Sequence, residues 1–135
     1  MRHAIPNRTA AILVAGLFCA GTPAAAQQDI HLPSGRDVSL IEMRTDSPGA
    51  DRIYRFRFLA PGLEGPSDFD TAEDDMAYLC EHYAIPHLPE DGPAADRIVV
   101  SLSDREIPFG QSVPEAVQFF EAYRPEGGTC IWEGL

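Results

Sequence analysis

The sequence contains no lysine: its ten basic residues are all arginine, against 21 aspartate and glutamate residues. Without lysine the chain cannot form a Schiff base, hold pyridoxal phosphate, or contact nucleotide phosphates as a phosphate-loop or protein-kinase lysine does. The formal net charge of −11 disfavours nucleic acids and anionic membrane surfaces as partners, because both require a basic face on the protein.

The length of the chain limits it to one domain. Its 135 residues are too few for two domains or for a large cofactor-binding fold. Hydrophobic residues make up 44% of the chain and charged residues 23%, which are values close to those of folded domains. We therefore expect one folded unit at residues 37–135 that uses no cofactor, preceded by a flexible lead at residues 27–36.

The first 26 residues have the three-part pattern of a secretory signal peptide. A positively charged start is followed by an uncharged run at residues 10–21 and then by small residues. The run is too short for a stable membrane anchor, which needs about 20 apolar residues. We predict cleavage after Ala26 and an exported protein, periplasmic or secreted, with no membrane span after cleavage. A retained anchor, a buried core helix and lipidation at Cys19 are the alternatives.

Cleavage would leave two cysteines, Cys80 and Cys130. An even number of cysteines in an exported chain indicates a disulfide. Such a bond would close a loop of about 50 residues and stabilise the fold by about 4 kcal/mol in the chain-entropy model. The alternatives are two free thiols or a redox pair, although the spacing differs from the C-x-x-C motif of thioredoxin-like proteins.

Hydrophobic periodicity predicts an α+β fold, in which a small antiparallel sheet of four to five strands carries two helices on one face and is joined by one disulfide. The second helix would begin at the capping box 112–115 and end at Pro125. The first would begin at Asp70 or Thr71 and end at Pro86. The segments predicted as strands are residues 37–44, 52–60, 97–102, 105–109 and 129–133, of which 105–109 would be an edge because of Pro108.

The densest polar cluster lies on and after the first predicted helix. Asp75 and His82 are seven residues apart and would share a helix face, and His87 follows in the next loop. Carboxylate and imidazole groups placed together can bind a divalent cation. The stretch lacks both the glycine and glutamate of a calcium-binding loop and the H-E-x-x-H motif of zinc hydrolases. A solvated helix N-terminus is the ordinary interpretation, and a metal site is the alternative.

Arg55 and Arg57 form a basic row on the predicted strand 52–60, whose other face is aromatic. The alternation predicts that the aromatic face is packed and that the arginine face is exposed to water. The two arginines could bind an acidic partner or the carboxylate of a ligand, or they could pair across the sheet with Glu42. The sequence has no G-x-S-x-G motif, but a Ser-His-Asp triad stays open, since its members can lie far apart in sequence.

Four short stretches in the last third of the chain carry a resemblance: residues 98–105 (IVVSLSDR), 108–110 (PFG), 118–124 (QFFEAYR) and 128–132 (GTCIW). Over residues 97–132 the chain resembles a family of small exported bacterial proteins of unknown function. The resemblance implies export. It assigns no activity and no catalytic residue.

The sequence therefore favours an exported, periplasmic, non-catalytic binding or envelope accessory protein whose partner is an unknown protein or small ligand. The expected contact surfaces are the edge strand near Pro108, which could add a strand from a partner, and the row of Arg55 and Arg57. One alternative is a small metal-dependent or hydrolytic enzyme that uses the acidic helix with His82 and His87. Another is a secreted inhibitor of a basic enzyme.

Overall fold

The computed structural model describes residues 21, 27–47, 49 and 51–134. The signal-peptide prediction for residues 1–26 therefore lies outside the described residues, apart from Gly21. Within the described part of the chain, no helix is long and apolar enough to cross a membrane.

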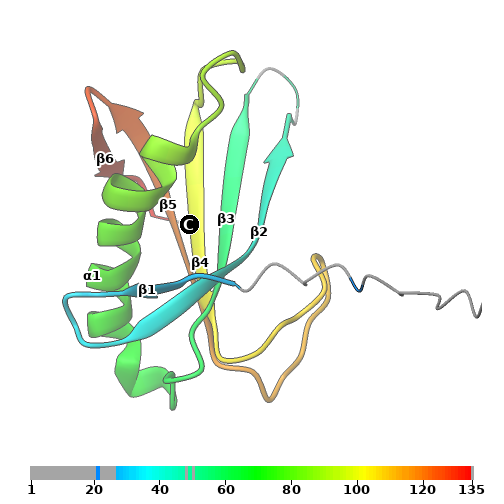
Figure 1. Ribbon diagram of the computed structural model, residues 1–135, viewed down its shortest axis with the longest axis vertical. Helices are drawn as coiled ribbons and strands as arrows, with labels where there is room; N and C mark the ends of the chain where they lie inside the picture. Colours follow the sequence, from blue (N-terminus) through cyan, green and yellow to red (C-terminus); the bar gives the residue numbers. More distant parts are fainter. Residues whose placement is uncertain (1–20, 22–26, 48, 50, 135) are drawn as a thin grey trace, which may run out of the picture.

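Six strands form one mixed sheet whose spatial order is the order of the sequence (Figure 1). They are β1 (Asp29–His31), β2 (Asp37–Asp46), β3 (Ile53–Leu59), β4 (Arg97–Ser103), β5 (Gln118–Glu126) and β6 (Thr129–Trp132). Neighbouring strands are antiparallel except for β3 and β4, which are parallel. A parallel pair needs a long crossover connection, which here contains the helix.

One α-helix, α1 (Phe69–Leu79), lies against one face of the sheet (Figure 1). A 3₁₀ turn (Pro66–Asp68) precedes it, and the chain continues through a wider π-helical turn (Cys80–Ala84) and a second 3₁₀ turn (Ile85–His87). The acidic residues at its start are favourable there because the helix dipole is positive at its N-terminus. The predicted first helix is confirmed.

The hydrophobic core lies between α1 and the sheet. Alternation along β3 directs Tyr54, Phe56 and Phe58 toward the helix, and each of these side chains is 2% exposed or less. Burying a side chain of this kind contributes about 1.5–3 kcal/mol relative to leaving it exposed. Apolar side chains of β4 and α1 also belong to this core: Ile98, Val100, Leu102, Ala72, Met76 and Leu79.

The predicted disulfide is present. It joins Cys80, fully buried at the end of α1, to Cys130 on β6, with a Cα–Cα distance of 6.2 Å. The backbone N–H of Cys130 also donates a hydrogen bond to the Glu81 carboxylate at 3.1 Å. The last strand is thus tied to the helix by one covalent and one polar contact.

The sheet differs from the one that the sequence predicts. It has six strands instead of four to five, and it is mixed instead of antiparallel. Two of its strands were not predicted as strands. One is β5, described below, and the other is β1, in the segment predicted to be a flexible lead, where Ile30 pairs with Val38. The parallel pairing of β3 with β4 was not predicted. The direction of β4 depends on the path of the connection through α1, and hydrophobic periodicity within a strand contains no information on that path.

The predicted second helix is wrong, because residues 118–126 form β5 instead. Phe119 and Tyr123 of β5 face α1, whereas Phe120 and Ala122 face the other side of the sheet. Apolar residues on both faces remove the period-2 signal and imitate helical spacing. The predicted edge strand at 105–109 is also wrong, since these residues belong to the loop between β4 and β5.

We predict that the disulfide supplies much of the stability. Urea unfolding of the oxidised and the reduced wild-type protein should differ by about 4 kcal/mol in the free energy of unfolding, because the cross-link restricts a loop of about 50 residues in the unfolded chain. The two samples share one sequence, so the comparison isolates the bond. A difference under about 1 kcal/mol would contradict the prediction.

Tyr123 gives a second prediction. Its side chain is 1% exposed, and its hydroxyl has no hydrogen-bond partner among the described residues. Burial, with Glu121 and Glu73 nearby, raises its pKa well above the usual value, so folding requires the neutral phenol. Tyr123→Phe should raise the free energy of unfolding by about 1 kcal/mol at pH 7. The gain should grow above about pH 10, where the unfolded chain ionises. Urea unfolding at pH 7 and pH 10.5 checks this; a loss of stability in the variant would refute it.

Candidate functional site

The face of the sheet opposite α1, called here the open face, is partly covered by the loop at residues 104–117, called here the strap. The backbone N–H of Asp104 donates to the carbonyl of Val117 at 3.0 Å and closes the base of the strap. Ile107 is 3% exposed, so it anchors the strap to the sheet. Beyond it, Gly110 turns the chain at a φ of +81°, a value that glycine adopts readily. The strap therefore has a defined course over the sheet.

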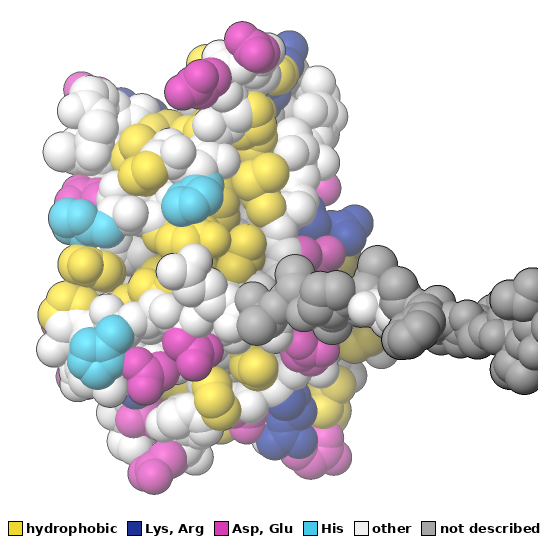
Figure 2. Space-filling model, in the orientation of Figure 1, with side chains coloured by type: hydrophobic (Ala, Val, Ile, Leu, Met, Phe, Trp, Pro, Cys, Tyr) yellow, Lys and Arg dark blue, Asp and Glu magenta, His cyan; other side chains and the backbone are white. Residues whose placement is uncertain are grey.

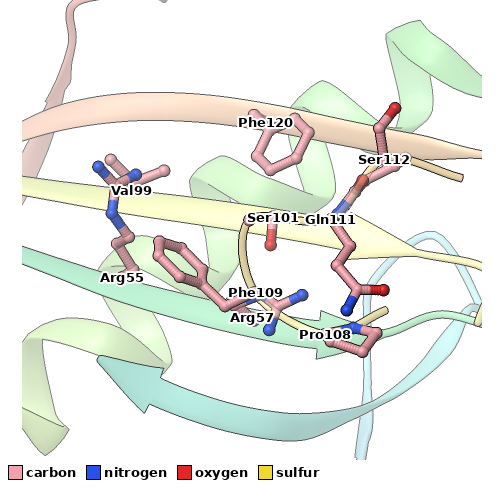
Figure 3. Close-up of a pocket in the computed structure, with 11 residues that line it drawn as sticks. Arg55, Arg57, Val99, Ser101, Pro108, Phe109, Gln111, Ser112 and Phe120 are labelled. Atoms are coloured by element: carbon pink, nitrogen blue, oxygen red, sulfur yellow. The ribbon is translucent and has the colours of Figure 1, made fainter. Parts of the chain in front are cut away.

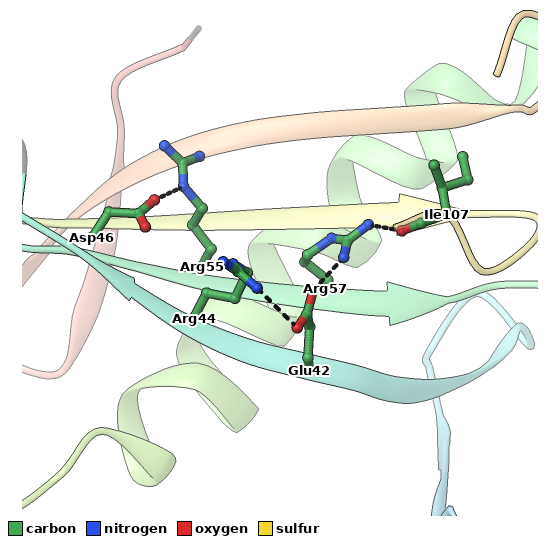
Figure 4. Close-up of polar contacts among 6 residues, drawn as sticks. All are labelled: Glu42, Arg44, Asp46, Arg55, Arg57 and Ile107. Carbon is green, nitrogen blue, oxygen red and sulfur yellow. Dashed lines mark hydrogen bonds and ion pairs between the residues drawn. The ribbon is translucent and has the colours of Figure 1, made fainter. Parts of the chain in front are cut away.

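Arginines and acids alternate on the open face of β2 and β3 (Figure 4). In the register, Arg57 lies opposite Glu42 and Arg55 lies opposite Arg44. Arg57 donates to the Glu42 carboxylate and to the backbone carbonyl of Ile107, whereas Arg55 donates through Nε to Asp46. Arg44 adds a longer contact of 3.4 Å to Glu42. The cross-strand pairing with Glu42 considered from the sequence is thus present.

The arginine side chains of β3 are less exposed to solvent than the sequence predicts. The side chain of Arg57 is only 8% exposed, and that of Arg55 is 29% exposed. Periodicity assigns both residues to one face, but it does not reveal that the strap covers that face. Arg57 is therefore a buried structural cation, and Arg55 is the more accessible of the two.

The cluster on the open face carries excess positive charge. Its three guanidinium groups, on Arg44, Arg55 and Arg57, face two carboxylates, on Glu42 and Asp46. The hydrogen bond from Arg57 is the main cause that lowers the pKa of Glu42, so this carboxylate stays ionised at neutral pH. Within these ion pairs the guanidinium groups outnumber the carboxylates by one, and the exposed Glu106 of the strap lies beside Glu42 and Arg57 in a neighbouring hollow. Acidic side chains are spread over the face of the molecule shown in Figure 2.

A pocket of about 280 Å³ lies between the sheet and the strap. Figure 3 shows Phe120 on one side of it and Phe109 with Arg57 on the other, with Ser101 between them, Arg55 at one end and Gln111 at the other. The rings of Phe109 and Phe120 are 44% and 45% exposed, which is unusual for large apolar side chains. The complete lining is Arg55, Arg57, Val99, Ser101, Pro108, Phe109, Gly110, Gln111, Ser112, Gln118 and Phe120.

Arginines surround the Phe109 ring at the rim of this pocket. The guanidinium carbon of Arg44 lies 4.2 Å from the ring centroid, and those of Arg57 and Arg55 lie at 5.6 and 5.8 Å. Cations within about 6 Å of an aromatic face are attracted to it. The ring is therefore held in place without a ligand, even though the strap residues around it are exposed.

The residues predicted as a metal site are not brought together. Asp75 is 2% exposed and forms an ion pair with Arg36, which also lies 3.7 Å from Asp68. His82 stacks on Tyr78 with ring centroids 4.3 Å apart. Asp75 thus joins α1 to the turn between β1 and β2, and the structure gives it a stabilising role.

His87 stacks on Tyr83, with ring centroids 4.0 Å apart, and its Nδ1 lies 2.7 Å from the carbonyl oxygen of the same residue. Among the residues that the structure describes, no three His, Cys, Asp or Glu side chains are grouped as a metal ion would require. The geometry therefore gives no support to a metal centre at Asp75, His82 and His87.

A family model, "Family of unknown function (DUF6497)", matches residues 15–135. The chain belongs to this family. The match confirms the resemblance to a family of unknown function and extends it from residues 97–132 to most of the chain. No curated protein and no solved structure shows a significant match to this chain.

Sequence reasoning identified Arg55 and Arg57 but missed the rest of the pocket. Phe120 was placed in a helix, and Phe109 in an edge strand, so neither was connected with the arginines. One available signal was the P-F-G sequence at 108–110, since an aromatic residue between proline and glycine is typical of a loop that presents its side chain. The pairing of β4 with both β3 and β5 then brings the two halves of the site together.

The Arg36–Asp75 pair gives a prediction that separates a structural role from a metal-binding one. Asp75→Ala should lower the free energy of unfolding by about 3 kcal/mol, because it removes the buried partner of a largely buried guanidinium and leaves it only the longer contact to Asp68. The double variant Arg36→Met/Asp75→Leu should regain most of the loss. Urea unfolding with and without EDTA measures both effects. Destabilisation of the wild type by EDTA, or a loss under about 1 kcal/mol in Asp75→Ala, would contradict the structural role.

Proposed function

We propose that this protein is an exported, non-catalytic binding module that takes a small ligand in the open-face pocket beneath the strap. The observation that carries the proposal is the pocket itself, in which accessible aromatic rings and an excess guanidinium charge meet in one concave space. Ligand sites are mostly apolar hollows with a few placed polar groups, and this pocket has that composition.

The pocket is built before any ligand arrives. Arg57 ties β2, β3 and the strap together through Glu42 and the Ile107 carbonyl. The floor, formed by Val99 and Ser101, belongs to a central strand of the sheet. A preorganised site binds more tightly because little ordering is left to occur on association.

The lining favours binding over catalysis. Among the residues that the structure describes, those that line the pocket include no His, Cys, Asp or Glu. The hydroxyls of Ser101 and Ser112 therefore have no general base beside them, and a serine nucleophile needs one. The described histidines lie elsewhere, His31 on β1 and His82 and His87 in the turns after α1.

The disulfide supports the exported location. Structural disulfides persist in oxidising compartments and are rare in the reducing cytosol. The Cys80–Cys130 bond joins two elements far apart in sequence and includes a fully buried sulfur-bearing residue, so it is a structural bond and not an accessible redox pair. This agrees with the secretory pattern in the first 26 residues.

A small-molecule library tests the proposal when binding is followed by protein NMR. We expect at least one compound class to shift backbone amides that border the pocket, with no turnover of the compound. Ser101→Leu, which fills the floor of the pocket, should abolish these shifts. Ser34→Leu makes the same chemical change at an exposed position outside the pocket, so it should leave binding unchanged.

Three results would refute the proposed function. The first is a complete absence of pocket shifts across the library, and the second is binding that persists in Ser101→Leu. The third is conversion of a bound compound to product. Urea unfolding of both variants shows whether they retain the fold, so a loss of binding can be assigned to the filled pocket.

A further inference from the structure

We infer that the ligand of the open-face pocket is a small carboxylic acid with one flat apolar body. Its carboxylate would meet the guanidinium of Arg55, and its apolar body would lie between Phe109 and Phe120. This inference rests on the proposed function and narrows it to one chemical class.

The preference for an anion follows from the charge balance beneath the strap. The ion pairs of the cluster join three guanidinium groups to two carboxylates, a surplus of one positive charge, and the nearby Glu106 does not line the pocket. A singly charged anion completes the balance. A doubly charged phosphate monoester would make the cluster negative, on a chain whose formal net charge is already −11.

The two arginines that line the pocket differ in whether their terminal nitrogens are available to a ligand. Both terminal nitrogens of Arg57 already donate, to Glu42 and to the Ile107 carbonyl. Arg55 uses Nε for Asp46, and its terminal nitrogens have no hydrogen-bond partner among the described residues. The side chain of Arg55 is also the more exposed and lines the pocket. Its two terminal N–H groups suit the two oxygens of a carboxylate, which guanidinium binds in a bidentate manner.

The apolar side chains that line the pocket indicate that part of the ligand is apolar. Val99, Pro108, Phe109 and Phe120 supply the apolar lining. The two aromatic rings are nearly half exposed, so a ligand that covers them removes apolar surface from water. Aromatic rings also favour offset or edge contacts with another flat ring.

The size of the pocket limits the ligand. Its volume of about 280 Å³ is just below the usual range for small-molecule sites, about 300–1,000 Å³. One ring or a short branched chain fits this space, and a dinucleotide or an oligosaccharide does not. Gln111 and Ser112 at the opposite end from Arg55 offer polar contacts for a second, uncharged substituent.

Calorimetry with four probes tests the inference on the wild-type protein alone. Phenylacetate has both the carboxylate and the ring, phenylacetamide has the ring without the charge, and acetate and inorganic phosphate have charge without a ring. We expect phenylacetate to bind with a Kd of about 1 mM or tighter. We expect the other three to bind about tenfold more weakly or worse, because each lacks one of the two interactions.

Two arginine variants locate the carboxylate. Arg55→Ala should weaken phenylacetate binding by about tenfold or more, and Arg55→Lys should recover part of the loss because it restores the charge but not the planar fork. Arg124→Ala is the matched control: Arg124 lies on the open face of β5, outside the pocket lining, and is about half exposed. It should leave the Kd unchanged.

The inference fails if phenylacetamide binds as tightly as phenylacetate, if Arg55→Ala binds as well as Arg124→Ala, or if phenylacetate does not bind. The amide comparison needs no variant, so it stays decisive even if Arg55→Ala is unfolded. In each of these cases the proposed function survives if another library compound occupies the pocket. The proposed function itself fails on any of the three results given above for the library test.

Discussion

The buried guanidinium of Arg57 holds the open face of the sheet and the strap together. It lies on β3 and contacts β2 through Glu42 and the strap through the Ile107 carbonyl. Without Glu42 the buried charge would be left uncompensated, at a cost of several kcal/mol. The course of the strap, the position of Phe109 and the shape of the pocket all depend on this one group. Arg55, two residues earlier on the same strand, keeps terminal nitrogens that have no hydrogen-bond partner among the described residues.

Local patterns predicted the parts of the fold that depend on local interactions. The apolar stripe of α1, the alternation in β3 and the pairing of Cys80 with Cys130 each follow from spacing or number alone, and the structure contains all three. The same alternation placed Arg55 and Arg57 on one face. These elements were predictable because α1 has one apolar face, β3 alternates aromatic with arginine side chains, and each cysteine has a single available partner.

The unpredicted parts depend on contacts between distant segments. β5 is apolar on both faces because α1 packs on one and the strap with its pocket lies over the other, and a strand of this kind lacks a period-2 signal. The capping-box pattern at 112–115 lies in the strap, where no helix follows. The pocket likewise needs the parallel pairing of β3 with β4, which sets Arg57 beside Ser101. No periodicity within one segment contains that information.

The placement of the helix and the strap on opposite faces of the sheet has a consequence for how sequences of this family can vary. α1 and its disulfide lie on one side of the sheet, and the strap and its pocket lie on the other. The strands between them keep the covalent cross-link and the pocket a full layer of backbone apart. Substitutions that change stability can therefore accumulate behind the sheet without altering the side chains in front of it, and the reverse also holds.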